Sequence, residues 1–258
     1  MWKHFLVEKR DFVTTVTINR PPYNTLSVGT LEELGRILDN LEADEETRVI
    51  LLTGSGDRAF SAGADMTEFG QAEGGPEATI RKVHTLFQRM EHFPKPIIAV
   101  INGYALGGGC ELQMACHLAV ASDQARLGLP EVKRGILPGY GGTQRMARLI
   151  GKRRALYYML RGEHISAEEA KSCGLINEIF PHDQLREKAF ELAASMARGS
   201  APLAMRGIIR AVGRGLEQSL EEGLALETEE MMKVVVSEDA AEGIQAFFSK
   251  REPEFRGR

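Results

Sequence analysis

One apolar run followed by two glycine clusters constrains the fold of this chain more than any other feature. Residues 97–101 (IIAVI) predict a buried strand, and four of the seven residues from 103 to 109 are glycine. A second cluster, Gly139, Gly141 and Gly142, leads into a predicted helix. Glycine permits positive φ and lets a ligand approach backbone N–H groups, which at a helix start favour negative charge. Close packing of a helix on a strand is the structural alternative for residues 107–109.

Two glutamates accompany these clusters. Glu111 lies one turn into a predicted apolar helix, and Glu131 follows a proline between apolar residues. Taken singly, each is more often a solvated or ion-paired residue. Carboxylates enclosed by apolar neighbours have raised pKa values unless they are paired, which is how enzymes tune acids. Together with backbone donors, the two predict a site that stabilises an oxyanion and moves protons nearby.

Composition narrows the function classes. The 258 residues carry a net charge of −4, which argues against a nucleic-acid surface. Three cysteines without CxxC spacing argue against disulfides and zinc, and for a reducing compartment. No two of the six histidines have metal-ligand spacing. Because no apolar run approaches the roughly 20 residues of a membrane span and no signal peptide is evident, we expect a soluble cytoplasmic protein.

The order of predicted elements indicates a layered α/β core. Alternation and helical periodicity predict strands at 4–10, 13–19, 49–53, 97–101 and 175–180, and helices after Ser27 and at 77–93. Ser166 and Glu169 predict a capping box for a helix that ends at Gly174. Residues 68–76 form a polar, glycine-rich stretch that predicts a loop, and residues 70–76 of it are expected to order around substrate. Helices are expected at 183–198, 202–214, 217–236 and 238–249, so we divide the chain into a core (1–198) and a helical oligomerisation region (199–258).

Other motifs are weak or missing. Residues 54–59 (GSGDRA) fit the GxGxxA dinucleotide fingerprint, but the residues that follow do not open a strong helix. The sequence contains no GxxxxGK[ST], HExxH or GxSxG, so phosphoryl transfer, zinc proteolysis and serine-esterase chemistry have no support.

Three segments resemble the enoyl-CoA hydratase/isomerase family, the crotonase superfamily. Residues 59–66 (AFSAGADM) resemble its AF-x-AGAD-[IM] loop, and residues 102–112 (NGYALGGGCEL) match a family segment nearly letter for letter. Residues 130–145 resemble its PE-x-x-x-G…PG-x-GGTQR segment. Two departures are His117, where many relatives carry aspartate, and Leu127 in place of phenylalanine. The order and spacing of the segments agree over the whole chain.

The resemblance implies an α/β fold, a crotonase-like right-handed spiral of ββα turns with a helical C-terminal trimerisation region. It implies a homotrimer or dimer of trimers that binds acyl-CoA thioesters, with no metal and no cofactor beyond the CoA of the substrate. Neither nucleic acid nor membrane is expected as a partner.

The resemblance also assigns residues. The N–H groups of Ala64 and Gly108 are expected to form an oxyanion hole, and Glu111 and Glu131 to hold one water. Our preferred assignment has Glu111 polarising the water and Glu131 supplying the α-proton, with the reverse left open. Further substrate and CoA contacts are expected from Asn24, Leu26, Ala62, Ala64, Asp65, Met66, Gly108, Leu129 and Gly139. Candidates for the CoA phosphates are Arg58, Lys152, Arg153 and, from a neighbouring subunit, Lys250.

Two glutamates favour an enoyl-CoA hydratase of fatty-acid or related catabolism. An enoyl-CoA isomerase, or another acyl-CoA lyase or hydrolase of the superfamily, is the alternative, since double-bond migration can run on one glutamate. A non-catalytic CoA-binding or RNA-binding relative is disfavoured by the intact glutamates and the acidic composition.

Overall fold

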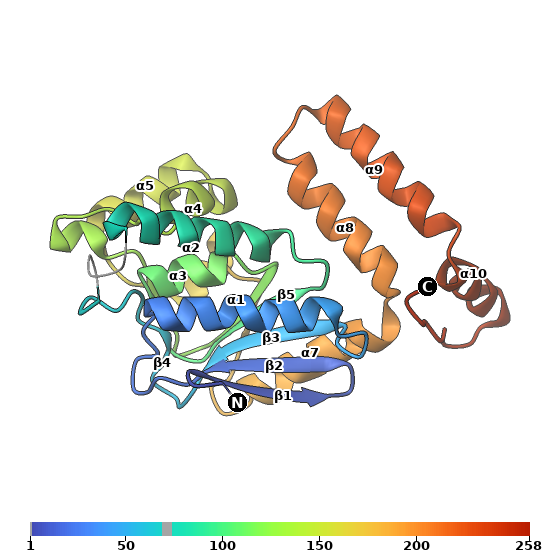
Figure 1. Cartoon of the computed structure of the whole chain (residues 1–258), viewed down its shortest axis with the longest axis horizontal. Coiled ribbons are helices and arrows are strands. Elements are labelled where there is room, and N and C mark those ends of the chain that lie inside the picture. Colours follow the sequence, from blue (N-terminus) through green and yellow to red (C-terminus); the bar gives the residue numbers. More distant parts are fainter. Residues whose placement is uncertain (1, 69–73) are drawn as a thin grey trace.

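The computed structural model describes residues 2–68 and 74–258 (Figure 1). Most of the predicted loop at 68–76 therefore lies outside the described residues. Its last two residues already belong to helix α2 (Gly75–Glu91), with Pro76 in the first turn, where its missing N–H is harmless.

The main sheet has six strands in the order β1-β2-β3-β5-β7-β10. A hairpin of β1 (Phe5–Arg10) and β2 (Val13–Ile18) opens it, and β2 then pairs in parallel with β3 (Val49–Gly54). Strands β5 (Ile97–Ile101), β7 (Leu118–Ser122) and β10 (Glu178–Phe180) continue the parallel order. Every residue of β3 and β5 is buried, as expected for strands covered on both faces.

A second sheet stacks beside the first and produces the expected ββα repeat. Its short strands β4 (Ala59–Ser61), β6 (Tyr104–Leu106) and β8 (Arg126–Gly128) pair in parallel, and β9 (Ile165–Ser166) closes it antiparallel to β8. The chain passes from β3 to β4 to α2, then from β5 to β6 to α3 (Gly108–Met114), and then from β7 to β8. Each turn of the spiral therefore adds one strand to each sheet.

Helices cover both faces of the main sheet. Helix α1 (Val28–Ala43) and α2 pack over one face, and α7 (Leu185–Gly199) packs over the other (Figure 1). Ser27 caps α1 by accepting a hydrogen bond from the Thr30 N–H (3.1 Å). The 3₁₀ turn η1 (Glu131–Arg134), α4 (Gly142–Ile150) and α5 (Lys152–Arg161) follow the third turn of the spiral. The capping box predicted for α6 (Ala167–Cys173) is present, with Gly174 at its end.

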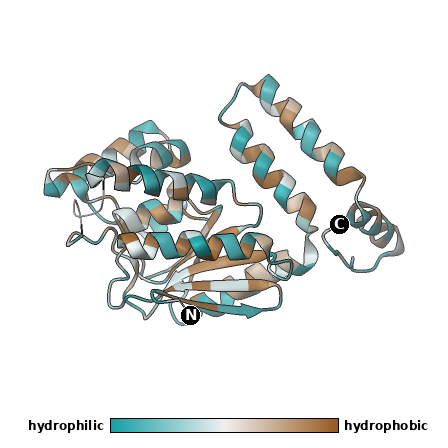
Figure 2. Cartoon of the chain, in the orientation of Figure 1, coloured by the Kyte–Doolittle hydropathy of each residue, from teal (hydrophilic) through white to brown (hydrophobic). Residues whose placement is uncertain are grey.

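The last three helices extend away from the sheets. Helices α8 (Pro202–Gly215) and α9 (Leu220–Val235) form a hairpin, and α10 (Glu238–Ser249) follows beside the C-terminus (Figure 1). The predicted helix at 217 begins later because Ser219 caps α9, and the predicted strand at 175 begins only at Glu178. Figure 2 shows hydrophobic bands along α8 and α9. The exposed apolar side chains on the last three helices and at their ends include Ile208, Val212, Leu216, Leu220, Leu224, Met231, Met232, Val236, Phe247 and Phe248.

Candidate active site

Glu111 is held in the first turn of α3. The helix begins where Gly107 takes a positive φ of 53°, and the Glu111 side chain beyond it is almost fully buried. Its Oε1 accepts hydrogen bonds from the backbone N–H groups of Tyr140 (2.8 Å) and Gly142 (2.7 Å). A Cβ on Gly142 would lie 2.9 Å from that oxygen, so the glycine lets the amide approach the carboxylate.

Glu131 approaches the same helix start from η1. A Cβ on Gly107 would lie 3.1 Å from Glu131 Oε1, so the carboxylate lies directly beside the residue that precedes α3. Its Oε2 is buried and has no hydrogen-bond partner among the described residues. A buried carboxylate oxygen without a donor is costly, and this geometry indicates a place where a bound molecule supplies the missing hydrogen bond.

The two carboxyl groups share an environment that disfavours charge. Burial raises the pKa of Glu111 to about 7, and the negative charge of Glu131 adds to the rise. The amides of Gly142 and Tyr140, together with Arg145, oppose it by stabilising the carboxylate. Burial likewise raises the pKa of Glu131. These directions agree with the expectation from the sequence, and they suit groups that exchange protons near neutral pH.

Two backbone amides face each other beside the glutamates. Gly63 has a φ of 98°, and a Cβ on it would lie 2.8 Å from the Gly108 nitrogen. A Cβ on Gly108 would lie 3.2 Å from the Ala64 nitrogen. Within the described part of the chain, neither the Ala64 nor the Gly108 amide donates a hydrogen bond to another residue. Two adjacent free N–H groups at a helix start have the geometry of an oxyanion hole.

Comparison with known protein sequences identifies the family of this chain. The model of the family "Enoyl-CoA hydratase/isomerase" matches residues 8–258. The chain belongs to this family. It is 45% identical to a probable enoyl-CoA hydratase of Bacillus subtilis, with 96% of each chain covered. It is 42% identical to the 2,3-dehydroadipyl-CoA hydratase of Escherichia coli, with 98% of each covered.

Solved structures agree with the sequence relatives. The crystal structure of an enoyl-CoA hydratase from Bacillus anthracis superposes with a TM-score of 0.95 at 40% identity, covering 99% of this chain and 100% of the other. A hydratase structure from Geobacillus kaustophilus gives the same TM-score at 33% identity, covering 99% and 97%. The crotonase fold expected from the resemblance is confirmed.

Several residues expected at the family's CoA-binding loop hold that loop together. Leu26 forms a parallel bridge with Ala64, in which the Asp65 N–H donates to the Leu26 carbonyl (3.1 Å). Asn24 is fully buried, and its side-chain amide donates to the carbonyls of Ser55 (3.1 Å) and Ala59 (2.7 Å). Asp65 is ion-paired with Arg20 (3.0 Å). Asn24 and Asp65 therefore support the loop through their side chains.

The other expected contacts lie at different points around the site. The Ala62 N–H donates to the Tyr23 carbonyl (2.9 Å), whereas the Met66 side chain is exposed. A Cβ on Gly142 would lie 3.0 Å from Leu129, which places Leu129 beside Glu111. The Gly139 carbonyl lies 2.7 Å from His84 Nε2, on the same turn as Tyr140.

The structure does not bring the four candidates for the CoA phosphates together within one chain. The Arg58 guanidinium stacks on Tyr23, 4.5 Å from the ring centroid. Lys152 and Arg153 begin α5, and Lys250 follows α10, at opposite ends of the molecule in Figure 1.

Tyr140 is a site residue that the sequence analysis did not single out. A Cβ on Gly108 would lie 3.0 Å from its ring, and the ring makes an edge-to-face contact with Phe87 at 6.2 Å between centroids. An aromatic residue between the glycines of the second cluster was the available signal. Its ring covers the Gly108 side of the oxyanion hole.

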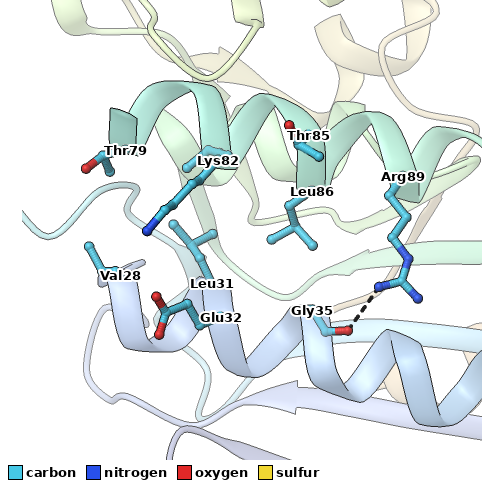
Figure 3. A pocket seen from close by; sticks show the side chains of 10 residues that line it. Val28, Leu31, Glu32, Gly35, Thr79, Lys82, Thr85, Leu86 and Arg89 are labelled. Carbon is cyan, nitrogen blue, oxygen red and sulfur yellow. Dashed lines mark hydrogen bonds between the residues drawn. The ribbon is translucent and has the colours of Figure 1, made fainter. Parts of the chain in front are cut away.

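A groove of about 370 Å³ lies between α1 and α2 (Figure 3). Neither catalytic candidate lines it, so the groove is not the reaction centre. Val28, Leu31 and Thr79 line both this groove and a smaller cavity, which is also lined by Leu26 and Tyr140.

The described residues contain no cluster of three His, Cys, Asp or Glu side chains that could hold a metal ion. Within residues 2–68 and 74–258, no helix combines the length and apolar character of a membrane crossing.

Proposed function

We propose that this chain is an enoyl-CoA hydratase, which adds water across the 2,3 double bond of a trans-2-enoyl-CoA to give a 3-hydroxyacyl-CoA. The family and its hydratase relatives show an enzyme of this type. The observation that carries the residue assignment is the approach of two buried glutamates to one helix start, beside two free amides. Such an enzyme serves fatty-acid or related acyl-CoA catabolism.

Each group has one task in the proposed mechanism. The thioester carbonyl oxygen accepts hydrogen bonds from the Ala64 and Gly108 N–H groups, which stabilise the enolate-like charge; one such donor is typically worth about 10²–10³ in kcat. Glu111 accepts a proton from water while the hydroxyl adds to C3. Glu131 delivers its proton to C2. The cycle closes when the proton on Glu111 is lost and Glu131 regains one from solvent.

The hydrogen bonds support this division of roles. The two amides on Glu111 Oε1 favour its charged form, as a base requires. The unpartnered Oε2 of Glu131 favours a protonated group, as an acid requires. Because these groups and the amides supply the chemistry, we propose that no cofactor is needed beyond the CoA of the substrate. Asn24, Leu26, Ala62, Asp65, Met66, Leu129 and Gly139 remain the proposed surroundings of the acyl-CoA.

We also propose a homotrimer or dimer of trimers, assembled through residues 199–258, in the cytoplasm. The exposed apolar side chains of α8–α10 support the assembly, because exposed apolar surface that gathers on one part of a protein marks contacts with other protein chains. Light scattering of the purified protein, which gives the mass of the particle, tests this proposal.

Product mass separates hydration from the other reactions of the family. Incubation with crotonyl-CoA is expected to yield a product heavier by one water, with loss of absorbance from the conjugated enoyl thioester. An isomerase leaves the mass unchanged, and a hydrolase releases free CoA. A substrate panel of short, branched and aromatic enoyl-CoAs that gives no added water would rule out the hydratase assignment.

A further inference from the structure

The direction of the Glu111 carboxylate depends on the segment that leads from η1 into α4. We call residues 139–142 the turn: Tyr140, one of the two amide donors to Glu111, lies in the segment between η1 and α4, and Gly142, the other, is the first residue of α4. They donate to the same oxygen, Oε1, so they fix the direction in which the carboxyl group faces. Any displacement of the turn therefore rotates or releases the proposed base.

Arg145 fastens this turn from inside α4. Its Nη1 donates to the Tyr140 carbonyl (2.9 Å), and its guanidinium lies against Gly141, where any Cβ would overlap it. Gly141 has a φ of 101°, a conformation that glycine adopts without strain. The turn therefore packs around the guanidinium. Tyr140 links the two groups, because its carbonyl accepts from Arg145 and its N–H donates to Glu111.

Glu91 holds Arg145 in place from the end of α2. The guanidinium Nε donates to Glu91 Oε1 (2.8 Å) and Nη2 donates to Glu91 Oε2 (2.6 Å), a bidentate pair. Only 13% of the Arg145 side chain is exposed, so solvent screens the pair less than an exposed one. The planar guanidinium donates to a carboxylate and a carbonyl at the same time, and a lysine ammonium cannot reproduce this geometry.

We propose that Glu91 and Arg145 are positioning residues for the reaction, acting through the turn at 139–142 on the orientation of Glu111. Among the described residues, the charges of Glu131 from η1 and Arg145 from α4 act on Glu111. Burial and then the charge of Glu111 raise the pKa of the Tyr140 hydroxyl and of the Cys110 thiol. The positive charge of Arg145 favours the Glu111 carboxylate, and Glu91 partly neutralises that charge. The proposal rests on the hydratase function proposed above.

Three variants test the pair, with kcat, KM and the pH profile as readouts. Arg145→Met is expected to lower kcat by about 10²-fold with little change in KM, as a misplaced base does. In the wild type, we expect activity to fall below about pH 7, where the Glu111 carboxylate becomes protonated. In Arg145→Met this acid limb of the pH profile is expected at higher pH, because the carboxylate loses a favourable charge. Glu91→Gln moves the limb to lower pH, because Arg145 is then less neutralised. Arg145→Lys keeps the charge, so its limb stays in place while kcat falls.

The control is Arg89→Met, which removes a guanidinium that donates to Asp39, Glu42 and the Gly35 carbonyl and that, among the described residues, makes no hydrogen bond to the turn. Equal kcat losses in Arg89→Met and Arg145→Met, or limbs that move in the same direction in Arg145→Met and Glu91→Gln, overturn the proposal. If Arg145→Met does not fold, the other two variants still give the comparison.

Infrared titration of the Glu111 carboxyl, assigned by its loss in Glu111→Gln, repeats the test without turnover. If the wild-type protein hydrates no enoyl-CoA, the proposed function is contradicted but the positioning role is not. If the pH at which Glu111 titrates is the same in all three variants as in the wild type, the positioning role is contradicted but the proposed function is not.

Discussion

The Glu111→Gln and Glu131→Gln variants each lose hydration of crotonyl-CoA by about 10²–10⁴ in kcat, the usual contribution of a general acid or base. Glutamine keeps the size of the side chain, and at position 111 its carbonyl oxygen can still accept from Tyr140 and Gly142. The fold and the substrate contacts therefore remain while one proton transfer is removed. Steady-state kinetics at several pH values measure the effect, with KM expected to change little.

Glu33→Gln is the matched control for these two variants. Glu33 is also a buried carboxylate on a helix, and it accepts from the backbone N–H groups of Lys3 (2.6 Å) and His4 (2.7 Å), away from the site. It is expected to keep the wild-type kcat. Near-normal hydration by either position 111 or position 131 variant would remove that residue from the mechanism. Because the pair acts as a unit, the double variant should fall little below the poorer single one.

Proton exchange separates the two roles. A saturated acyl-CoA in D₂O can exchange its α-proton through Glu131 and the oxyanion hole, with no water to activate. Glu111→Gln is therefore expected to retain this exchange, and Glu131→Gln to lose it. The opposite pattern would reverse the assignment of acid and base.

The proposed reaction centre could be predicted from the sequence because its close backbone approaches leave room only for glycine. A Cβ on Gly107 would lie 3.1 Å from Glu131 Oε1, and one on Gly142 would lie 2.9 Å from Glu111 Oε1, so the site needs glycine in both clusters and the sequence shows it. The short strands β4, β6 and β8 could not be predicted, since three residues are too few to show the alternation of apolar and polar side chains that marks a strand. Their pairing joins segments far apart in the chain, which local patterns do not record.

Side-chain roles that depend on distant partners were also beyond the sequence. Arg145 lies in a matched family segment, yet its function depends on Glu91, 54 residues earlier. His117, noted as a departure from many relatives, accepts a hydrogen bond at Nδ1 from the Ile97 N–H (2.9 Å). Burial lowers its pKa to about 4, so the imidazole is neutral and forms a structural contact with the first residue of β5. Only the assembled fold shows which polar residues stabilise it and which are left for substrate.

Gly109→Ala is expected to disrupt both stability and activity. Gly109 lies where the first turn of α3 crosses β4, and a Cβ there would overlap the Ser61 carbonyl oxygen and lie 2.7 Å from the carbonyl carbon. Backbone atoms cannot rotate aside, so we expect a loss of about 3 kcal/mol or more in the free energy of unfolding. The forced separation also moves Gly108 away from Ala64, and hydration should fall with the loss of an oxyanion donor.

Gly29→Ala provides the matched substitution, because its Cβ would meet nothing nearer than 3.9 Å and helix α1 gains an alanine. Its stability should rise by up to about 1 kcal/mol, with kcat unchanged. Urea unfolding followed by circular dichroism, together with the crotonyl-CoA assay, compares the two variants. Wild-type stability and turnover in Gly109→Ala would show that α3 and β4 can separate without cost, and the close approach that forms the oxyanion hole would lose its structural basis.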